Sequence, residues 1–251
     1  MPAKQIAALA KSPKRTAPDA LKAEIQSVLA TLKRLGSPRF RAEMETRYGI
    51  VTKDAFGVRM NQMQHVAKQL GRNHALALAL WKTGNYEART VAALVAEPER
   101  VTAALMDRWS RDFDNWAICD TVCFKLFDQV PPAFGRVKAW ANQKDEFQKR
   151  AAFALLACLA LHDEDAGDQV FKDMLPLIEA AATDERNFVK KGVSWALRAI
   201  GSRNVKLHAA TMKIAQQLKT SPNAAARWIG SDVVRDITRP VVARRLARAN
   251  E

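Results

Sequence analysis

The sequence predicts an all-α protein whose helices follow one another in a repeated array. Apolar residues recur with helical spacing from about residue 19 to the end of the chain. No segment alternates apolar and polar residues over a convincing length, so no strand is expected. The composition agrees, because 48% of the 251 residues are hydrophobic, while the helix breakers Gly and Pro number only 10 each.

Proline, glycine and polar breaks mark the boundaries of the expected helices. Pro18 and Asp19 open the first helix, and a Gly-Ser-Pro break after Leu35 ends it. The later helices are delimited in the same way, by their apolar periodicity and by the short polar segments between them. In chain order the expected helices span 18–35, 39–48, 59–71, 73–83, 87–96, 98–108, 115–129, 132–142, 146–162, 170–182, 185–200, 205–218, 223–236 and 240–249.

A faint repeat runs through these helices. Residues 87–92, 148–153, 189–194 and 225–230 each open a helix with polar or basic residues followed by small apolar ones. Their spacings run from the thirties to just over sixty, which fits an irregular HEAT-like array of helix pairs. We therefore expect HEAT-like repeats that form a curved α-solenoid, with a concave basic face built from one helix of each pair.

The chain is expected to form a single helical-repeat domain over residues 19–251, preceded by a flexible basic tail over residues 1–18. The tail contains no acidic residue, and its cations are Lys4, Lys11, Lys14 and Arg15. A mitochondrial presequence is the alternative interpretation of this segment. A tail is favoured because chain termini that are not tied to the core are commonly unstructured.

The charge of the chain indicates a polyanionic partner. Lys and Arg number 40 against 26 Asp and Glu, which gives a net charge of +14. Nucleic acid is the leading candidate. An anionic membrane would need a basic amphipathic anchor, and none stands out. Generic basicity with no such partner is the alternative.

The cysteines and the hydropathy indicate where the protein acts. The three cysteines, an odd number in a chain of this length, favour a reducing compartment without a disulfide framework. No apolar run of 18 residues is present, so no membrane span is expected. Together these observations predict a cytoplasmic protein, associated with the nucleoid when it is bound to DNA.

Three helices carry large or charged residues that fall outside their own apolar stripes. At about 100° per residue, Asp120 points about 140° from the stripe of its helix, with Trp116 one turn earlier on the same side. Arg150 points almost opposite the stripe of its own helix. Trp195 also points away from its stripe, between the cations Lys191 and Arg198.

These residue types suit a nucleic-acid site. Aromatic faces accept a base, a sugar or a cationic group, and Lys and Arg bind phosphates. A lone carboxylate on a basic surface stabilises positive charge that develops on a substrate or activates a water molecule. Two other interpretations stay open. Asp120 would form an ion pair with an arginine of a neighbouring repeat, or Trp195 would pack against the next repeat.

Other candidate chemistry is set aside. Cys119 and Cys123 have a spacing that permits metal binding, but Cys119 lies on the apolar stripe and no second ligand pair follows. The acidic segment 162–168 lacks the spacing of a calcium loop. No phosphate-binding loop, dinucleotide fingerprint or Ser/His/Asp pattern occurs. No metal and no cofactor is expected.

Four segments of the chain resemble the AlkD-like DNA alkylation repair glycosylases, a family built of HEAT-like repeats. The matching segments are residues 80–89, 114–120, 148–152 and 187–198, in the order found in the family. The likeness extends over roughly residues 20–240. Its most specific parts are the Trp-x-x-x-Asp pair that ends at Asp120 and the Lys-Lys-x-x-x-Trp-x-Leu-Arg run that begins at residue 190.

The resemblance implies a function and a set of site residues. It implies a monofunctional, metal-free enzyme that excises cationic N3-alkyladenine and N7-alkylguanine from double-stranded DNA. Asp120 would be the catalytic carboxylate, Trp116 and Trp195 would contact the damaged nucleotide, and Arg150 would contact the DNA backbone. The further DNA-binding residues expected in these segments and in the last repeat are Lys149, Lys190, Lys191, Arg198 and Arg227. A monomer is expected.

Two other functions remain open. The same charge and helices would suit a non-catalytic repeat protein that binds damaged or branched DNA. A protein-binding scaffold is the third candidate, and it would have an apolar groove with evenly scattered cations.

Overall fold

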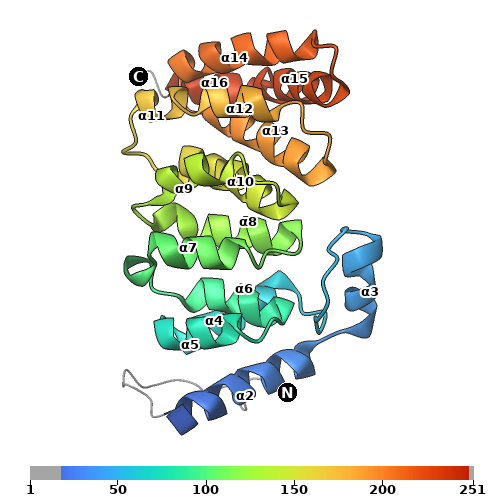
Figure 1. Cartoon of the computed structure of the whole chain (residues 1–251), viewed down its shortest axis with the longest axis vertical. Coiled ribbons are helices and arrows are strands. Elements are labelled where there is room, and N and C mark those ends of the chain that lie inside the picture. Colours follow the sequence, from blue (N-terminus) through green and yellow to red (C-terminus); the bar gives the residue numbers. More distant parts are fainter. Residues whose placement is uncertain (1–17, 249–251) are drawn as a thin grey trace. The chain divides into compact units, whose positions relative to one another are not determined.

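The computed structural model describes residues 18–248, and over this range the chain is helical with no strand. The all-α prediction is therefore confirmed for these residues (Figure 1). The first helix, α2 (Pro18–Leu35), has the predicted bounds. Apart from Pro18, the predicted basic tail lies outside the described residues.

The chain divides into two compact units at residue 101, inside the segment predicted as a single domain. The first unit contains one long helix, α2, several shorter helices, and one long connection between α3 and α4. Its elements are α2, α3 (Pro38–Thr46), α4 (Met60–Leu70), α5 (His74–Trp81), α6 (Tyr86–Val95) and the 3₁₀ turn η2 (Pro98–Arg100). Helices α4 and α5 both pack against α6, and α2 packs against α5 and α6.

A buried carboxylate fixes the long connection of the first unit. Glu87 on α6 is fully buried and accepts hydrogen bonds from the backbone N–H groups of Phe56, Gly57 and Val58 at 2.9, 2.8 and 3.1 Å. Gly57 has a φ of 79°, and a Cβ there would lie 2.4 Å from the carbonyl oxygen of Ser37. The connection therefore needs a glycine at position 57 and a side chain with two acceptor oxygens at position 87.

The second unit consists of helices that stack in two layers. Helices α8, α10, α13 and α15 follow one another in contact, and we call them the site layer. Helices α7, α9, α12 and α14 each pack against a member of the site layer (Figure 1). The elements of this unit are α7 (Ala103–Ser110), α8 (Trp116–Lys125), η3 (Phe127–Gln129), α9 (Ala133–Trp140), α10 (Glu146–His162), α11 (Asp168–Lys172), α12 (Leu175–Ala181), α13 (Asn187–Gly201), α14 (Val205–Lys219), α15 (Ala224–Ile237) and α16 (Pro240–Arg248).

Asparagine caps define where many of these helices begin. In each case the side-chain oxygen accepts the backbone N–H three residues later, which satisfies one of the unpaired donors of the first turn. The capping residues are Asn73, Asn85, Asn115, Asn204 and Asn223, before α5, α6, α8, α14 and α15.

Three predicted helices are each divided in the structure. The predicted helix 98–108 is broken where Val101 and Thr102 are extended and Thr102 caps α7. The predicted helix 115–129 ends at Leu126, whose φ and ψ of −142° and −57° leave the helical region. The predicted helix 170–182 is two short helices, and Pro176, which has no N–H to donate, lies in the first turn of the second. Among residues 18–248, no helix is both long and apolar enough to span a bilayer.

We predict that Glu87→Gln destabilises the first unit. The amide leaves one acceptor oxygen where the carboxylate offers two, and its NH₂ group faces backbone donors. The free energy of unfolding should fall by about 1–3 kcal/mol, measured by urea denaturation. Glu99→Gln, which alters an exposed residue of the same unit, serves as the control. Equal stability of the two variants would contradict the anchoring role of Glu87.

Candidate nucleic-acid interface

The centre of the site layer is a two-point ion pair between Asp120 on α8 and Arg150 on α10. The Nε and Nη2 groups of Arg150 donate to the two carboxylate oxygens of Asp120 at 2.8 and 2.6 Å. The side chains are only 7% exposed for Arg150 and 19% for Asp120. The ion pair with an arginine of a neighbouring repeat, one of the alternatives open from the sequence, is thus present in the structure.

The same arginine also reaches the next helix of the layer. Its Nη1 group donates to the carbonyl oxygen of Phe188 on α13 at 2.6 Å. Gly192 on α13 lies against this side chain, and a Cβ at that position would be in ordinary van der Waals contact with the Arg150 Cγ, at 3.5 Å. Arg150 therefore connects α8, α10 and α13. Its predicted contact with the DNA backbone stays a prediction, and most of its donors face protein acceptors.

Burial and the ion pair act on the protonation of Asp120 in opposite directions. Burial raises the pKa of the Asp120 carboxyl, and the adjacent guanidinium opposes that rise. Burial lowers the pKa of Arg150, but the carboxylate outweighs burial and the net change is a rise. The carboxylate is thus a desolvated anion that depends on its arginine partner to remain ionised.

Two part-exposed tryptophans lie on the helices that flank α10. Trp116 lies one turn before Asp120 on α8. Trp195 lies one turn after the exposed Lys191 on α13. The structure therefore places the predicted catalytic residues on two helices of one layer, α8 and α13, with α10 between them. Their roles stay predictions.

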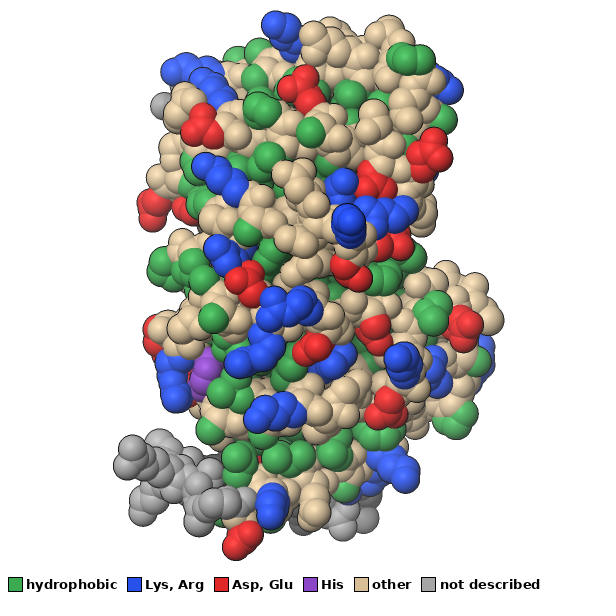
Figure 2. Space-filling model, in the orientation of Figure 1, with side chains coloured by type: hydrophobic (Ala, Val, Ile, Leu, Met, Phe, Trp, Pro, Cys, Tyr) green, Lys and Arg blue, Asp and Glu red, His purple; other side chains and the backbone are tan. Residues whose placement is uncertain are grey.

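The predicted DNA-binding cations differ in how far their charges are neutralised. Lys149 pairs with Asp184 at 3.0 Å, and hydrogen bonds from Arg186 hold the pKa of Asp184 well below its usual range. Arg198 lies 3.6 and 3.7 Å from carboxylates on α15. The exposed residues are Lys191 and Arg227, and Arg227 donates to the backbone carbonyls of Ser221 and Pro222. Figure 2 shows cations and anions interspersed on one face.

One exposed aromatic residue of the layer was not singled out from the sequence. Trp228 on α15 is 38% exposed, and the Lys190 ammonium lies 4.8 Å from the centre of its ring. The signal was present, since at about 100° per residue Trp228 points about 130° from the apolar stripe of its helix. The bond between Arg150 and the Phe188 carbonyl had no sequence signal, because any residue type supplies a carbonyl.

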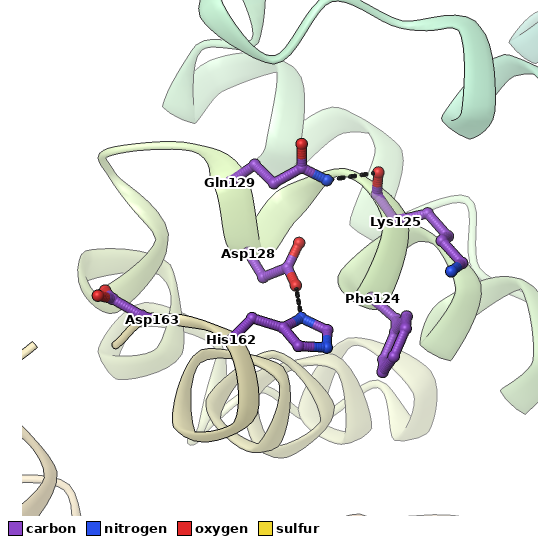
Figure 3. Close-up of a pocket in the computed structure, with 6 residues that line it drawn as sticks. All are labelled: Phe124, Lys125, Asp128, Gln129, His162 and Asp163. Atoms are coloured by element: carbon purple, nitrogen blue, oxygen red, sulfur yellow. Dashed lines mark hydrogen bonds and ion pairs between the residues drawn. The ribbon is translucent and has the colours of Figure 1, made fainter. Parts of the chain in front are cut away.

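A small hollow opens at the far ends of α8 and α10 (Figure 3). It encloses about 520 Å³, and His162 donates from Nδ1 to the almost fully buried Asp128 at 2.5 Å. The rings of Phe124, one turn after Asp120, and His162 meet in a T-shaped contact with centroids 4.4 Å apart. The lining carries both signs of charge and comprises Phe124, Lys125, Asp128, Gln129, His162 and Asp163.

The cysteines and acidic residues do not gather into a metal site within the described range. No group of three or more His, Cys, Asp or Glu side chains among residues 18–248 has a metal-binding arrangement. Cys119, Cys123 and Cys158 are buried and unbridged, as expected for apolar packing residues. Burial raises the pKa of Cys123 and Cys158 well above the usual range.

Comparison with solved structures supports the repeat fold. A protein from a family related to the HEAT-like repeat DNA glycosylases, with affinity for branched DNA structures, matches with a TM-score of 0.71 and 22% identity. The match covers 84% of this chain and 94% of the other. Two designed armadillo repeat proteins match with TM-scores of 0.34 and 0.38 and identities of 12% and 13%, too distant to support an argument. They cover 100% and 93% of this chain, and 88% and 99% of their own. The prediction of HEAT-like helical repeats is confirmed.

Comparison at the sequence level identifies the family. No curated protein matches the chain. The family described as DNA alkylation repair enzyme matches residues 28–234, which include Trp116, Asp120, Arg150 and Trp195. The chain belongs to the DNA alkylation repair enzyme family.

Proposed function

We propose that this protein is a monofunctional DNA glycosylase that hydrolyses the N-glycosidic bond of cationic N3-alkyladenine and N7-alkylguanine in double-stranded DNA. The observation that carries the proposal is a desolvated carboxylate, Asp120, held by two hydrogen bonds from Arg150 on a layer that also presents Trp116 and Trp195. The proposed enzyme acts as a monomer in the cytoplasm and uses no metal or cofactor.

The proposed reaction needs one reactive group from the protein, a carboxylate. An N-alkylated purine already carries a positive charge, so it leaves as a neutral base when it takes the electron pair of the glycosidic bond. The deoxyribose is left with a cationic C1′. The Asp120 carboxylate stabilises that cation and positions a water molecule. The water oxygen bonds to C1′ and one proton is released, which leaves an abasic site.

Arg150 is a positioning residue in this proposal. Its two donors fix both carboxylate oxygens of Asp120, so little reorganisation is needed when charge develops on the sugar. It also opposes the effect of burial, which would otherwise favour the protonated and inactive carboxyl. The guanidinium also has an opposing effect, because its positive charge weakens the electrostatic attraction between the carboxylate and the sugar cation.

Exposed cations would hold the DNA backbone beside this centre. Lys191 on α13 and Arg227 on α15 are exposed on the site layer, and both suit phosphate oxygens. The net charge of +14 supports a polyanionic partner. Lys149, Lys190 and Arg198 would also contact the DNA backbone. Each would either keep the protein contact described above or exchange it for a contact with a phosphate.

A second candidate function is DNA binding without catalysis. The specific observation in its favour is that Asp120 is already fully paired, as a purely structural carboxylate would be. The structural relative with affinity for branched DNA agrees with this candidate. It predicts tight, salt-sensitive binding of DNA with no release of bases.

We predict that Asp120→Asn lowers the single-turnover rate of 7-methylguanine release from methylated DNA by at least about 100-fold. The amide is nearly the same size but has no charge to offer the sugar cation. Asp165→Asn, a change at an exposed loop residue, is the control, and thermal unfolding shows that each variant is folded. DNA binding by the wild type without any base release would support the second candidate instead.

The raised pKa of Asp120 predicts an unusual pH dependence. Activity requires the carboxylate, so it is lost as the pH falls through the pKa of Asp120, which lies above the ordinary aspartate value. Arg150→Lys removes the two-point contact, so the pKa should rise further. The acid limb of the release rate, corrected for spontaneous depurination, should then move to higher pH. An acid limb that stays in place would contradict the role given to Arg150.

A further inference from the structure

Trp228 is an aromatic residue that lies outside the buried apolar face of its helix, α15. The apolar side of α15 is complete without it, since the buried residues of this helix are Ala225, Ala226, Ile229, Gly230, Val233 and Ile237. Trp228 instead leaves 38% of its surface exposed. A single exposed apolar residue is ordinary, so its neighbours decide whether it belongs to a binding site.

The neighbours of Trp228 place it on the site layer beside a cation. One turn later on the same side of α15, Asp232 accepts a hydrogen bond from Ser194 on α13 at 2.6 Å. The indole therefore faces α13, where the Lys190 ammonium lies 4.8 Å from the ring centre. An aromatic face beside a cation suits the backbone of a DNA duplex, because the ring packs on a deoxyribose and the cation meets the phosphate.

The position of α15 in the layer sets the distance from Asp120. Helices α8, α10, α13 and α15 contact one another in that order. Arg150 joins the Asp120 carboxylate to the Phe188 carbonyl. Lys190, two residues after Phe188, reaches the Trp228 ring. With ordinary bond lengths between these contacts, the indole lies at most about 24 Å from the carboxylate. At 3.4 Å per nucleotide along one strand, this separation corresponds to at most about seven nucleotides.

We propose that Trp228 and Lys190 form a second nucleotide contact, which binds the backbone of one duplex arm of the DNA within about seven nucleotides of the base at Asp120. The proposal rests on the DNA-binding part of the proposed function and not on catalysis. It makes binding depend on the length of the DNA on one side of the lesion.

The test uses duplexes with a single tetrahydrofuran abasic-site analogue, which contain no base to release. One duplex has 14 base pairs on both sides of the analogue, and two others are shortened to four base pairs on one side or the other. Affinity is measured by fluorescence anisotropy for the wild type, Trp228→Ala, Trp228→Phe and Lys190→Gln. Val205→Ala and Lys213→Gln remove matched exposed side chains on α14, outside the site layer.

Trp228→Ala should weaken binding to the long duplex by about threefold to 30-fold, the range expected when the exposed part of one aromatic ring is no longer buried against the DNA backbone. Trp228→Phe should restore most of the affinity, and Lys190→Gln should weaken it. With one of the two shortened duplexes, the wild type and Trp228→Ala should bind equally.

The proposal is overturned if Trp228→Ala binds the long duplex as the wild type does, or if its loss is the same with every duplex. Absence of DNA binding by the wild type would also overturn it. Failure of the glycosylase proposal is a separate result, since it is the absence of base release from methylated DNA.

Discussion

The second unit depends on one buried interaction, the pair formed by Asp120 and Arg150. Through three donors Arg150 reaches α8 and α13 from α10, so one side chain sets the relative positions of three helices of the site layer. Two charges this deeply buried are tolerated only because each satisfies the other, and removal of one partner of a buried pair commonly costs about 3–5 kcal/mol. Stability and the proposed chemistry therefore rest on the same two residues.

The net charge of the chain overstates how much positive charge this layer offers to DNA. Lys149, Arg186 and Arg198 lie against the carboxylates of Asp184, Asp232 and Asp236. Ion pairs of this kind hold side chains in place but cancel long-range attraction. The exposed cations Lys191 and Arg227 are left to meet phosphates, with Lys190 beside Trp228. Such a surface favours a few positioned contacts over a broad electropositive groove.

The sequence predicted the helices and which of them carry the site residues, because apolar periodicity and capping residues act locally. Helix 18–35 and helix 146–162 have the predicted bounds, whereas breaks such as the one at Leu126 depend on tertiary packing. Helical placement showed that Asp120, Arg150 and Trp195 point away from their own apolar stripes. It did not show that Asp120 and Arg150 bind each other, since they are thirty residues apart and their meeting depends on how α8 packs on α10. The Phe188 carbonyl could not be predicted, because it is a backbone group.

The central claim is that the Asp120 carboxylate stabilises a cation at C1′ of the damaged nucleotide. The most direct measurement compares the affinity of the protein for two abasic analogues in the same duplex, a cationic azasugar and the neutral tetrahydrofuran. A catalyst binds a mimic of its transition state more tightly than a neutral analogue. The account predicts tighter binding of the cationic analogue by the wild type, and loss of that preference in Asp120→Asn with little change for the neutral one. Equal affinity of the wild type for both analogues would contradict it.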